Sequence, residues 1–210
     1  MILHNNVFKK VSEVGMTNYI EINNARLCNC HRGYLSCIEP RNWMKNQIGV
    51  WQFTYEPRDV RDKKVHPAVF PISMAKRVIE QFTHKGELVL DPFVGSGTTL
   101  VAAQDLERNA VGFDLKQEYV DLSNARVANP PENHPCKQIA VCDDARNIVN
   151  RITPGTVKLV FTSPPYANIL NRERKNKSRR GDLRKNEQFG KIEQYSQDPR
   201  DLGTLSVENF

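Results

Sequence analysis

The chain has 210 residues, of which 39% are hydrophobic and 26% are charged, and its formal net charge is +6 at pH 7. This length lies between one and two domains of roughly 150 residues, and it suffices for a hydrophobic core without disulfides. No window approaches the roughly 20 apolar residues of a membrane-spanning helix, so we expect no membrane protein. The positive charge is compatible with a polyanionic partner but does not identify one.

The N-terminus and the cysteines indicate a cytoplasmic protein without a metal. The first residues, MILHNNVFKK, lack the apolar stretch that follows the basic start of a signal peptide. An odd and sparse set of cysteines argues against a disulfide scaffold. A zinc site at Cys28, Cys30, His31 and Cys37 is conceivable, but this spacing lacks the paired CxxC of structural zinc modules, so we predict reduced cysteines. The remaining cysteines are Cys136 and Cys142.

Three regions of the chain differ in composition. Residues 1–65 show few clean periodicities, and we expect them to pack on the domain that follows. Residues 66–166 alternate short apolar runs with stretches of helical periodicity, and we expect the binding and catalytic core there. Residues 167–210 are almost wholly polar, which predicts a flexible basic segment.

The middle region predicts alternating helices and strands. The first element is a helix on which apolar residues recur from Ile72 to Phe82, with Ser73 as its candidate N-cap and Gly86 just past its end. In chain order there follow a strand over Glu87–Leu90, a helix over Thr98–Glu107, a strand ending at Asp114, a helix over Gln117–Val127, a strand over Gln138–Cys142, a short helix over Asp144–Asn150 and a strand over Val157–Thr162. This alternation is typical of βαβ units, so we predict an open, mostly parallel α/β fold.

Small, acidic or rigid residues follow every predicted strand. The first strand leads into DPFVGSGTT (residues 91–99), the second ends at Asp114, the third precedes Asp143 and Asp144, and the fourth leads into SPPY (residues 163–166). Ligands of open α/β sheets bind outside the carboxyl ends of the strands. We therefore expect these residues to converge on one crevice.

The glycine turn has two interpretations, a simple strand-to-helix turn or a nucleotide site. Asp114, about 20 residues further on, favours the second, since an acid there can bind ribose hydroxyls. Leu100 stands where a dinucleotide site has its third glycine, and Asp91 would repel phosphate but suit an amine. A ligand with a ribose, a positive charge and no phosphate fits best, and S-adenosylmethionine is such a ligand.

Three motifs together carry a family resemblance. HPAVFP (residues 66–71), DPFVGSGTT and TSPPY (residues 162–166) resemble the DNA amino-methyltransferases, which methylate the exocyclic nitrogen of cytosine or adenine. The resemblance covers roughly residues 40–170. It implies a Rossmann-like sheet of the S-adenosylmethionine-dependent methyltransferase type, double-stranded DNA as partner, and a role in DNA methylation such as restriction-modification.

The resemblance assigns the methionine end of the cofactor to the glycine turn. Asp91 would bind the methionine amino group, and Thr98 and Thr99 would meet its carboxylate at the N-terminus of a helix, where exposed N–H groups favour an anion. The backbone at Phe93, Gly95 and Gly97 would leave room for the cofactor.

The resemblance assigns the rest of the cofactor to other segments. Asp114 would hold the ribose, and Asp144 would reach the adenine amino group, with Asp143 as the less favoured substitute. His66 and Phe70 would close over the methionine end.

The tetrapeptide Ser163, Pro164, Pro165 and Tyr166 would carry the transfer. The amino nitrogen of a base is a poor nucleophile, because its lone pair is delocalised into the ring. In the family, the first residue and the carbonyl of the following proline accept its N–H groups, and the prolines hold these acceptors in place. Tyr166 would stack on a base flipped out of the duplex. The alternative is a proline-stiffened loop with a packing tyrosine.

The sequence leaves several methyl acceptors as alternatives. Serine at position 163 favours cytosine over adenine by family habit. An RNA or protein methyltransferase is the alternative, although such relatives use NPPY, whereas this chain has SPPY after a DPF opening.

Basic residues after the tetrapeptide are candidates for contact with DNA phosphates. The alternative is a solvated loop. The candidates are Arg172, Arg174, Lys175, Lys177, Arg179 and Arg180.

The sequence after Ala167 contains none of the further apolar strands that complete a methyltransferase sheet. The fourth strand would then be an uncovered edge. We therefore expect a truncated or split methyltransferase. The alternatives are that a second chain or a second copy completes its sheet, or that the chain is an inactive fragment that still binds cofactor or DNA.

Overall fold

The computed structural model describes residues 19–47, 49–57, 59, 69–165 and 198–205. Its strands are β1 (Leu88–Asp91), β2 (Asn109–Asp114), β3 (Gln138–Cys142) and β4 (Val157–Val160). Its helices are α1 (Pro40–Asn46), α3 (Ile72–Phe82), α4 (Thr98–Asp105) and α5 (Gln117–Val127), with short 3-10 helices η2 (Ala145–Asn150) and η5 (Leu202–Thr204). Within the described residues, no helix is long and apolar enough to span a bilayer.

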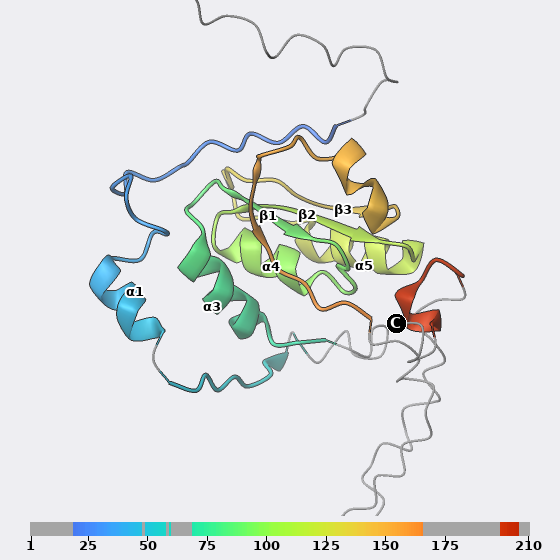
Figure 1. Cartoon of the computed structure of the whole chain (residues 1–210), viewed down its shortest axis with the longest axis horizontal. Helices are drawn as coiled ribbons and strands as arrows, with labels where there is room; N and C mark the ends of the chain where they lie inside the picture. Colours follow the sequence, from blue (N-terminus) through green and yellow to red (C-terminus); the bar gives the residue numbers. More distant parts are fainter. Residues whose placement is uncertain (1–18, 48, 58, 60–68, 166–197, 206–210) are drawn as a thin grey trace, which may run out of the picture.

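The four strands form one parallel sheet in the order β3-β2-β1-β4. Helices connect the strands, and α3, α4 and α5 cover one face of the sheet (Figure 1). The predicted open, parallel α/β fold is therefore confirmed. Within the described part of the chain, β3 and β4 are the two edges, and Val160 on β4 is 55% exposed.

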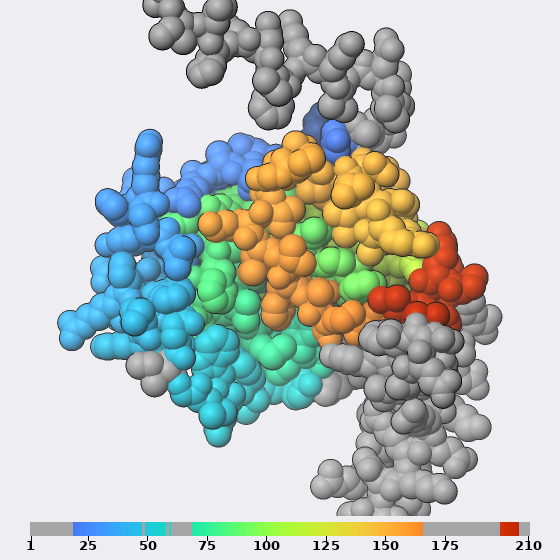
Figure 2. Space-filling model, viewed as in Figure 1, coloured from blue at the N-terminus to red at the C-terminus, as the bar shows by residue number. Residues whose placement is uncertain are grey.

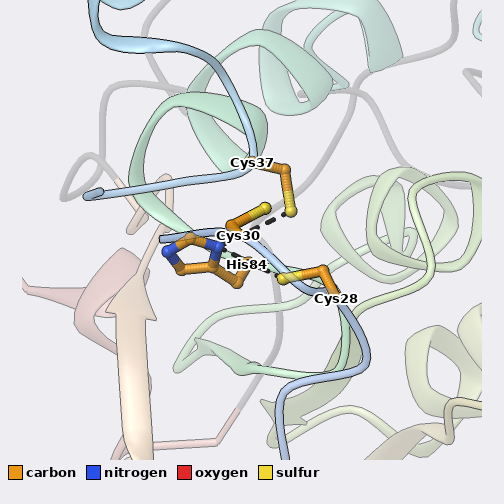
Figure 3. Close-up of side chains that lie close together, drawn as sticks. All are labelled: Cys28, Cys30, Cys37 and His84. Atoms are coloured by element: carbon orange, nitrogen blue, oxygen red, sulfur yellow. Dashed lines mark hydrogen bonds between the residues drawn. The ribbon is translucent and has the colours of Figure 1, made fainter. Parts of the chain in front are cut away.

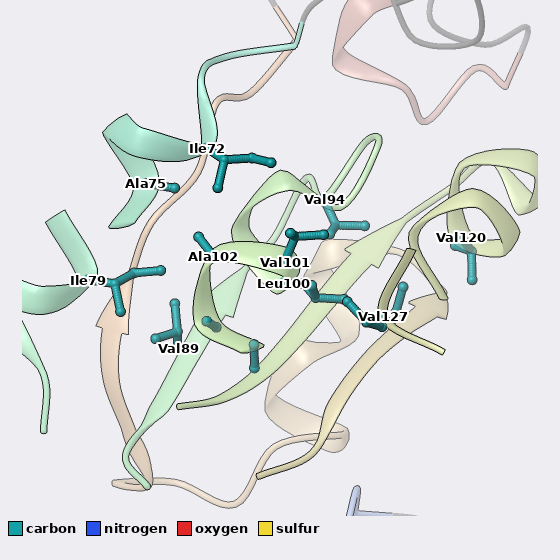
Figure 4. Packing of buried hydrophobic residues seen from close by; sticks show 13 residues of the cluster. Ile72, Ala75, Ile79, Val89, Val94, Leu100, Val101, Ala102, Val120 and Val127 are labelled. Carbon is teal, nitrogen blue, oxygen red and sulfur yellow. The ribbon is translucent and has the colours of Figure 1, made fainter. Parts of the chain in front are cut away.

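Successive residues of the central strands point to opposite faces of the sheet, which gives the molecule two hydrophobic layers. Val89 of β1 faces α3 and α4, where it packs with Ile79 and Leu100 (Figure 4). Its neighbours Leu88 and Leu90 face the other layer, together with Phe113 of β2. All of these side chains are at most 5% exposed.

The second layer is covered by segments outside the main helices. Ile20 and Ile22 of the extended N-terminal segment pack against it, as does Ile148 of η2. The N–H of Ile20 donates to the carbonyl of Arg151 at 2.8 Å. Figure 1 shows this blue segment running across the sheet on the side away from α4 and α5.

Two predicted elements end earlier than their apolar patterns indicate. The helix predicted over Thr98–Glu107 ends at Asp105, because Glu107 adopts a left-handed conformation with φ of 59°. The strand predicted to reach Thr162 ends at Val160. Beyond it, Phe161 still donates its N–H to Leu90, at 3.0 Å, so the chain keeps its course towards the carboxyl edge of β1.

Candidate active site

A cavity of about 210 Å³ lies at the carboxyl ends of the strands. It is built from loops that follow β1, β2, β3 and β4, together with the segments 69–70 and 200–202. In Figure 2 the red residues 198–205 lie beside the yellow surface around η2. The lining residues are Val69, Phe70, Pro92, Phe93, Val94, Gly95, Ser96, Thr98, Asp114, Leu115, Tyr119, Asp143, Asp144, Ala145, Arg146, Ser163, Pro165, Arg200, Asp201 and Leu202.

The glycine turn after β1 packs tightly between β2 and α5. Gly97 precedes α4 with φ of 79°, in the left-handed region that favours glycine. A Cβ on Gly97 would lie 2.8 Å from the Cβ and Oγ of Ser123 on α5. The Ser123 hydroxyl donates to the Gly95 carbonyl at 2.8 Å, and Val94 donates its N–H to Phe113 of β2. Hydrogen bonds therefore attach the turn to β2 on one side and to α5 on the other. Because Gly97 has no side chain, α5 can lie directly against the turn.

Thr98, the first residue of α4, lines the cavity and carries a buried polar atom that is unsatisfied. Its side chain is 3% exposed and lines the cavity, and its Oγ1 has no hydrogen-bond partner within the described residues. A buried hydroxyl without a partner is costly. The first N–H groups of a helix also lack intrahelical partners and favour an anion. This end of the cavity therefore suits an anionic oxygen of a ligand.

Asp114 ends β2 and faces the cavity. Its Oδ2 accepts the Gly95 N–H and its Oδ1 accepts the Lys116 N–H, each at 3.0 Å. Burial raises the pKa of Asp114 to about 6, although these two hydrogen bonds favour the ionised form. A carboxylate has about four lone-pair sites, so Asp114 retains acceptor capacity for ligand hydroxyls.

Asp91, at the end of β1, does not line the cavity. The side chain is 1% exposed. Its Oδ1 accepts the Phe93 N–H at 3.1 Å and the Thr162 hydroxyl at 2.7 Å, while its Oδ2 accepts the Thr99 hydroxyl at 2.5 Å. Burial raises the pKa of Asp91 despite these three donors. The carboxyl group thus joins the glycine turn, the start of α4 and the segment after β4.

Two acids follow β3 and face the cavity with different partners. Asp144 binds the Arg146 guanidinium through Nε at 3.0 Å and Nη2 at 2.6 Å, and these hydrogen bonds lower the pKa of Asp144 to about 2. For Asp143, burial acts to raise the pKa, but hydrogen bonds from Asn147 and Arg151 outweigh it and the pKa is lowered. Both groups are carboxylates at neutral pH.

The segment after β4 carries part of the tetrapeptide to the cavity. Ser163 and Pro165 line it, whereas Pro164 does not. Phe70 closes this end, and its ring packs edge-on against Phe161 with ring centroids 5.4 Å apart. The serine therefore lies in the same cavity as the acid that ends β2.

Of the predicted site residues that the structure describes, most line the cavity and a few do not. Those lining the cavity are Phe70, Phe93, Gly95, Thr98, Asp114, Asp143, Asp144, Ser163 and Pro165. Those described but outside the lining are Asp91, Gly97, Thr99 and Pro164. Those outside the described residues are His66, Tyr166, Arg172, Arg174, Lys175, Lys177, Arg179 and Arg180.

Sequence reasoning missed one side of the cavity. Arg200, Asp201 and Leu202 line it from a segment whose polar composition gives no sign of a binding role. The Asp201 side chain accepts the Gly203 N–H at 2.7 Å and begins η5. An acid two residues before a glycine is too common a pattern to predict this contact. Tyr119, in the first turn of α5, also lines the cavity and was missed.

Comparison with known proteins gives partial matches. A family model described as DNA methylase matches residues 9–125. The type II methyltransferase M.BglI of Bacillus subtilis is 42% identical over 96 residues, which is 46% of this chain and 26% of that protein. M.HpaI of Haemophilus parainfluenzae, also a type II methyltransferase, is 34% identical over 82 residues, 39% of this chain and 26% of that protein. The chain thus spans about a quarter of the length of these relatives.

Among solved structures, one from Thermus thermophilus is described as a DNA modification methylase complexed with S-adenosyl-L-methionine. It is 27% identical with a TM-score of 0.36, and the match covers 50% of this chain and 40% of that one. A structure described as an rRNA methylase of Clostridium thermocellum is 19% identical with a TM-score of 0.38, over 45% of this chain and 51% of that one.

Proposed function

This chain belongs to the N6/N4 DNA methylase family, and from that membership we propose that its cavity binds S-adenosylmethionine for transfer of the methyl group to an exocyclic amino group of cytosine or adenine in DNA. The observation that carries the proposal is the meeting of Thr98, Asp114 and Ser163 in one cavity. An anion site, a hydroxyl acceptor and a site for the reacting amine are the three features that this reaction needs.

The polar atoms of the cavity support the proposal of this cofactor. The unpaired Thr98 hydroxyl and the N-terminus of α4 would hold the methionine carboxylate. Asp114 would accept the ribose hydroxyls, and Asp144 or Asp143 would accept the adenine amino group. Phe70 would cover the methionine end. The cofactor itself supplies an electrophilic methyl group on a positively charged sulfur.

Asp91 has a positioning role in this proposal. The resemblance suggests contact with the methionine amino group, but the three donors of Asp91 come from the protein itself. Through Thr99 it orients α4, and through Thr162 it orients the residue next to Ser163. We propose that the carboxyl group fixes the distance between the cofactor turn and the tetrapeptide.

The base would be activated by hydrogen-bond acceptors of the tetrapeptide. The Ser163 Oγ and the Pro164 carbonyl would accept the two amino hydrogens, which shifts electron density onto the nitrogen. Tyr166 would stack on the flipped base, and aromatic stacking contributes roughly 1–3 kcal/mol per base. Serine at position 163 favours cytosine, and the type II relatives support a role in restriction-modification.

Transfer of labelled methyl groups tests this function. We expect label from S-[methyl-³H]adenosylmethionine to enter plasmid DNA and not RNA, with N4-methylcytosine or N6-methyladenine in the digested nucleosides. Ser163→Ala should abolish transfer while cofactor binding stays within about twofold, because the serine acts on the base. Label in RNA or in protein would favour the alternative substrates. Label in DNA that is unchanged by Ser163→Ala would contradict the role of the tetrapeptide.

The two threonines that begin α4 offer a matched pair. Thr98→Val should leave the free energy of unfolding unchanged or raise it by about 1 kcal/mol, since it removes an unpaired buried hydroxyl. It should weaken S-adenosylmethionine binding by about tenfold, the effect of one hydrogen bond to a charged group. Calorimetric titration and urea denaturation measure the two quantities.

Thr99→Val is the control for Thr98→Val. The Thr99 hydroxyl donates to the buried Asp91 carboxyl, so its loss should lower the free energy of unfolding by about 2 kcal/mol. Equal losses of stability for the two variants would contradict the assignment of Thr98 to the ligand.

Cofactor affinity should fall in mild acid because of Asp114. Its pKa of about 6 means that the carboxyl group protonates between pH 7 and pH 5 and then loses acceptor capacity for ribose hydroxyls. The folded-state pKa is raised, so this group's contribution to folding stability is greatest below pH 4 and is lost as the pH rises through 6. That contribution is about 3 kcal/mol. Titrations at pH 5, 6 and 7 check the affinity, and an Asp114→Asn variant that keeps the same pH dependence would contradict it.

A further inference from the structure

Three cysteines and one histidine from distant parts of the chain meet away from the cavity. Cys28, Cys30 and Cys37 belong to the N-terminal segment, and His84 lies in the turn between α3 and β1. One ligand atom from each residue lies within 4.8 Å of all the others (Figure 3). We propose that these four residues bind one Zn²⁺ ion, which fastens the N-terminal segment to the sheet.

The distances are those of a tetrahedral metal site. The Nδ1 of His84 lies 3.4 Å from the Sγ of Cys28 and 3.6 Å from the Sγ of Cys37. Zinc bonds of about 2.3 Å to sulfur and about 2.0 Å to nitrogen, at a tetrahedral angle, separate sulfur and nitrogen by roughly 3.6 Å. A single ion between these atoms would therefore bind all of them with little rearrangement.

The imidazole of His84 is oriented for metal binding. The side chain is fully buried, and its Nε2 lies 3.0 Å from the carbonyl oxygen of Tyr34. A carbonyl oxygen can only accept, so Nε2 carries the proton and Nδ1 presents its lone pair to the cysteines. Metal-binding histidines almost always donate their other N–H group in this way, which fixes the tautomer and the ring orientation.

Backbone hydrogen bonds attach the N-terminal segment to the chain around the cluster. The Lys85 N–H donates to the Sγ of Cys37 at 3.4 Å. Leu27 donates its N–H to the Lys85 carbonyl at 2.9 Å, and Arg26 pairs with Glu87 at 2.8 Å. These contacts join the N-terminal segment that carries the cysteines to residues 85–87, which follow His84.

His31, which the sequence places beside these cysteines, is engaged elsewhere. Its Nδ1 accepts the Gly33 N–H at 3.1 Å, and its ring packs on Tyr34 with centroids 5.5 Å apart. The sequence predicted no metal, because the spacing around His31 lacks a paired motif. The fold supplies His84 instead, 47 residues after Cys37 in the chain.

The chemistry of the ligands indicates a structural zinc. Three thiolates and one imidazole form a closed set for a four-coordinate ion, whereas a catalytic zinc keeps a position for water. His84 lies shortly before β1, at the amino end of the strand, whereas the cavity lies at the carboxyl ends. The ion would therefore stabilise the packing of residues 28–37 against the domain and take no part in methyl transfer.

Metal analysis of the full chain tests the proposal. Chain purified under reducing conditions from cells supplied with zinc and iron should contain one zinc per molecule by mass spectrometry. Replacement of zinc by Co²⁺ should give the intense visible absorption of a tetrahedral site and a thiolate charge-transfer band. Iodoacetamide should modify the exposed Cys142 at once, and Cys28, Cys30 and Cys37 only after chelation.

Two histidine variants provide the matched comparison. His84→Gln should reduce bound zinc at least tenfold and expose the three cysteines to alkylation, whereas His31→Gln should retain one zinc per chain. If His84→Gln does not fold, the cobalt spectrum of the unaltered chain still tests whether the site is tetrahedral. Folded chain without zinc, with iron in its place, with a disulfide among the three cysteines, or with zinc lost in His31→Gln would overturn the proposal.

Discussion

Gly97→Ala is expected to lower the free energy of unfolding by about 3 kcal/mol. A side chain at φ of 79° costs about 1 kcal/mol, and forcing a methyl group into a packed site costs about 1–3 kcal/mol more. The added Cβ would lie 2.8 Å from the Cβ of Ser123 and 2.9 Å from its Cα, so α5 would have to move. Urea denaturation measures the change.

Gly155→Ala is the matched control, because Gly155 has the same φ of 79° and a Cβ there meets no atom of the described chain within 4 Å. It should cost only about 1 kcal/mol, the backbone contribution alone. The difference between the two variants isolates the contact between the glycine turn and α5. Equal effects would mean that Ser123 yields without cost and that Gly97 matters only for its backbone conformation.

Asp91→Ala is expected to lower the free energy of unfolding by about 4 kcal/mol. It would leave the Thr99 hydroxyl, the Thr162 hydroxyl and the Phe93 N–H without their acceptor in a buried site. Each unsatisfied buried donor costs about 1–3 kcal/mol, and rearrangement recovers part of the loss. Thermal or urea denaturation at pH 7 provides the measurement.

Asp91→Asn separates the two roles that have been considered for this residue. An asparagine can still accept the Thr162 and Phe93 hydrogen bonds, and it carries no charge to bury, so stability should stay within about 1 kcal/mol of the original. If Asp91 acts by positioning, cofactor affinity should also change by less than about threefold. A loss of a hundredfold or more in a stably folded Asn variant would show that the charge contacts the cofactor directly.

Much of the core could be predicted because its signals are local. The helix predicted from apolar residues at helical spacing is observed as α3, and Ile72, Ala75 and Ile79 are fully buried. The predicted N-cap at Ser73 is wrong, because the helix already begins at Ile72, after Pro71. The polar residues after each strand could be expected to meet, because parallel strands place their carboxyl ends at one edge. The cavity confirms this convergence for Asp114 and Ser163.

Tertiary contacts that have no local signal could not be predicted. Whether Asp91 faces a ligand or the interior depends on Thr99 and Thr162, and the second of these lies 71 residues away. The pairing of His84 with Cys28 and Cys37 likewise depends on how the N-terminal segment crosses the end of α3. Spacing in the sequence indicates which residues are close along the chain, but it does not indicate contacts between distant segments. The hydrogen bonds of Asp91 and the cluster around His84 therefore became visible only in the structure.

Calorimetric titration of S-adenosylmethionine into the folded chain is the most direct test of the proposed site. We expect one molecule bound per chain at pH 7, competition by S-adenosylhomocysteine, and at least tenfold weaker binding to Asp114→Ala. If a chain shown to be folded by circular dichroism binds no cofactor at millimolar concentration, or binds it equally well after Asp114→Ala, this cavity is not the S-adenosylmethionine site.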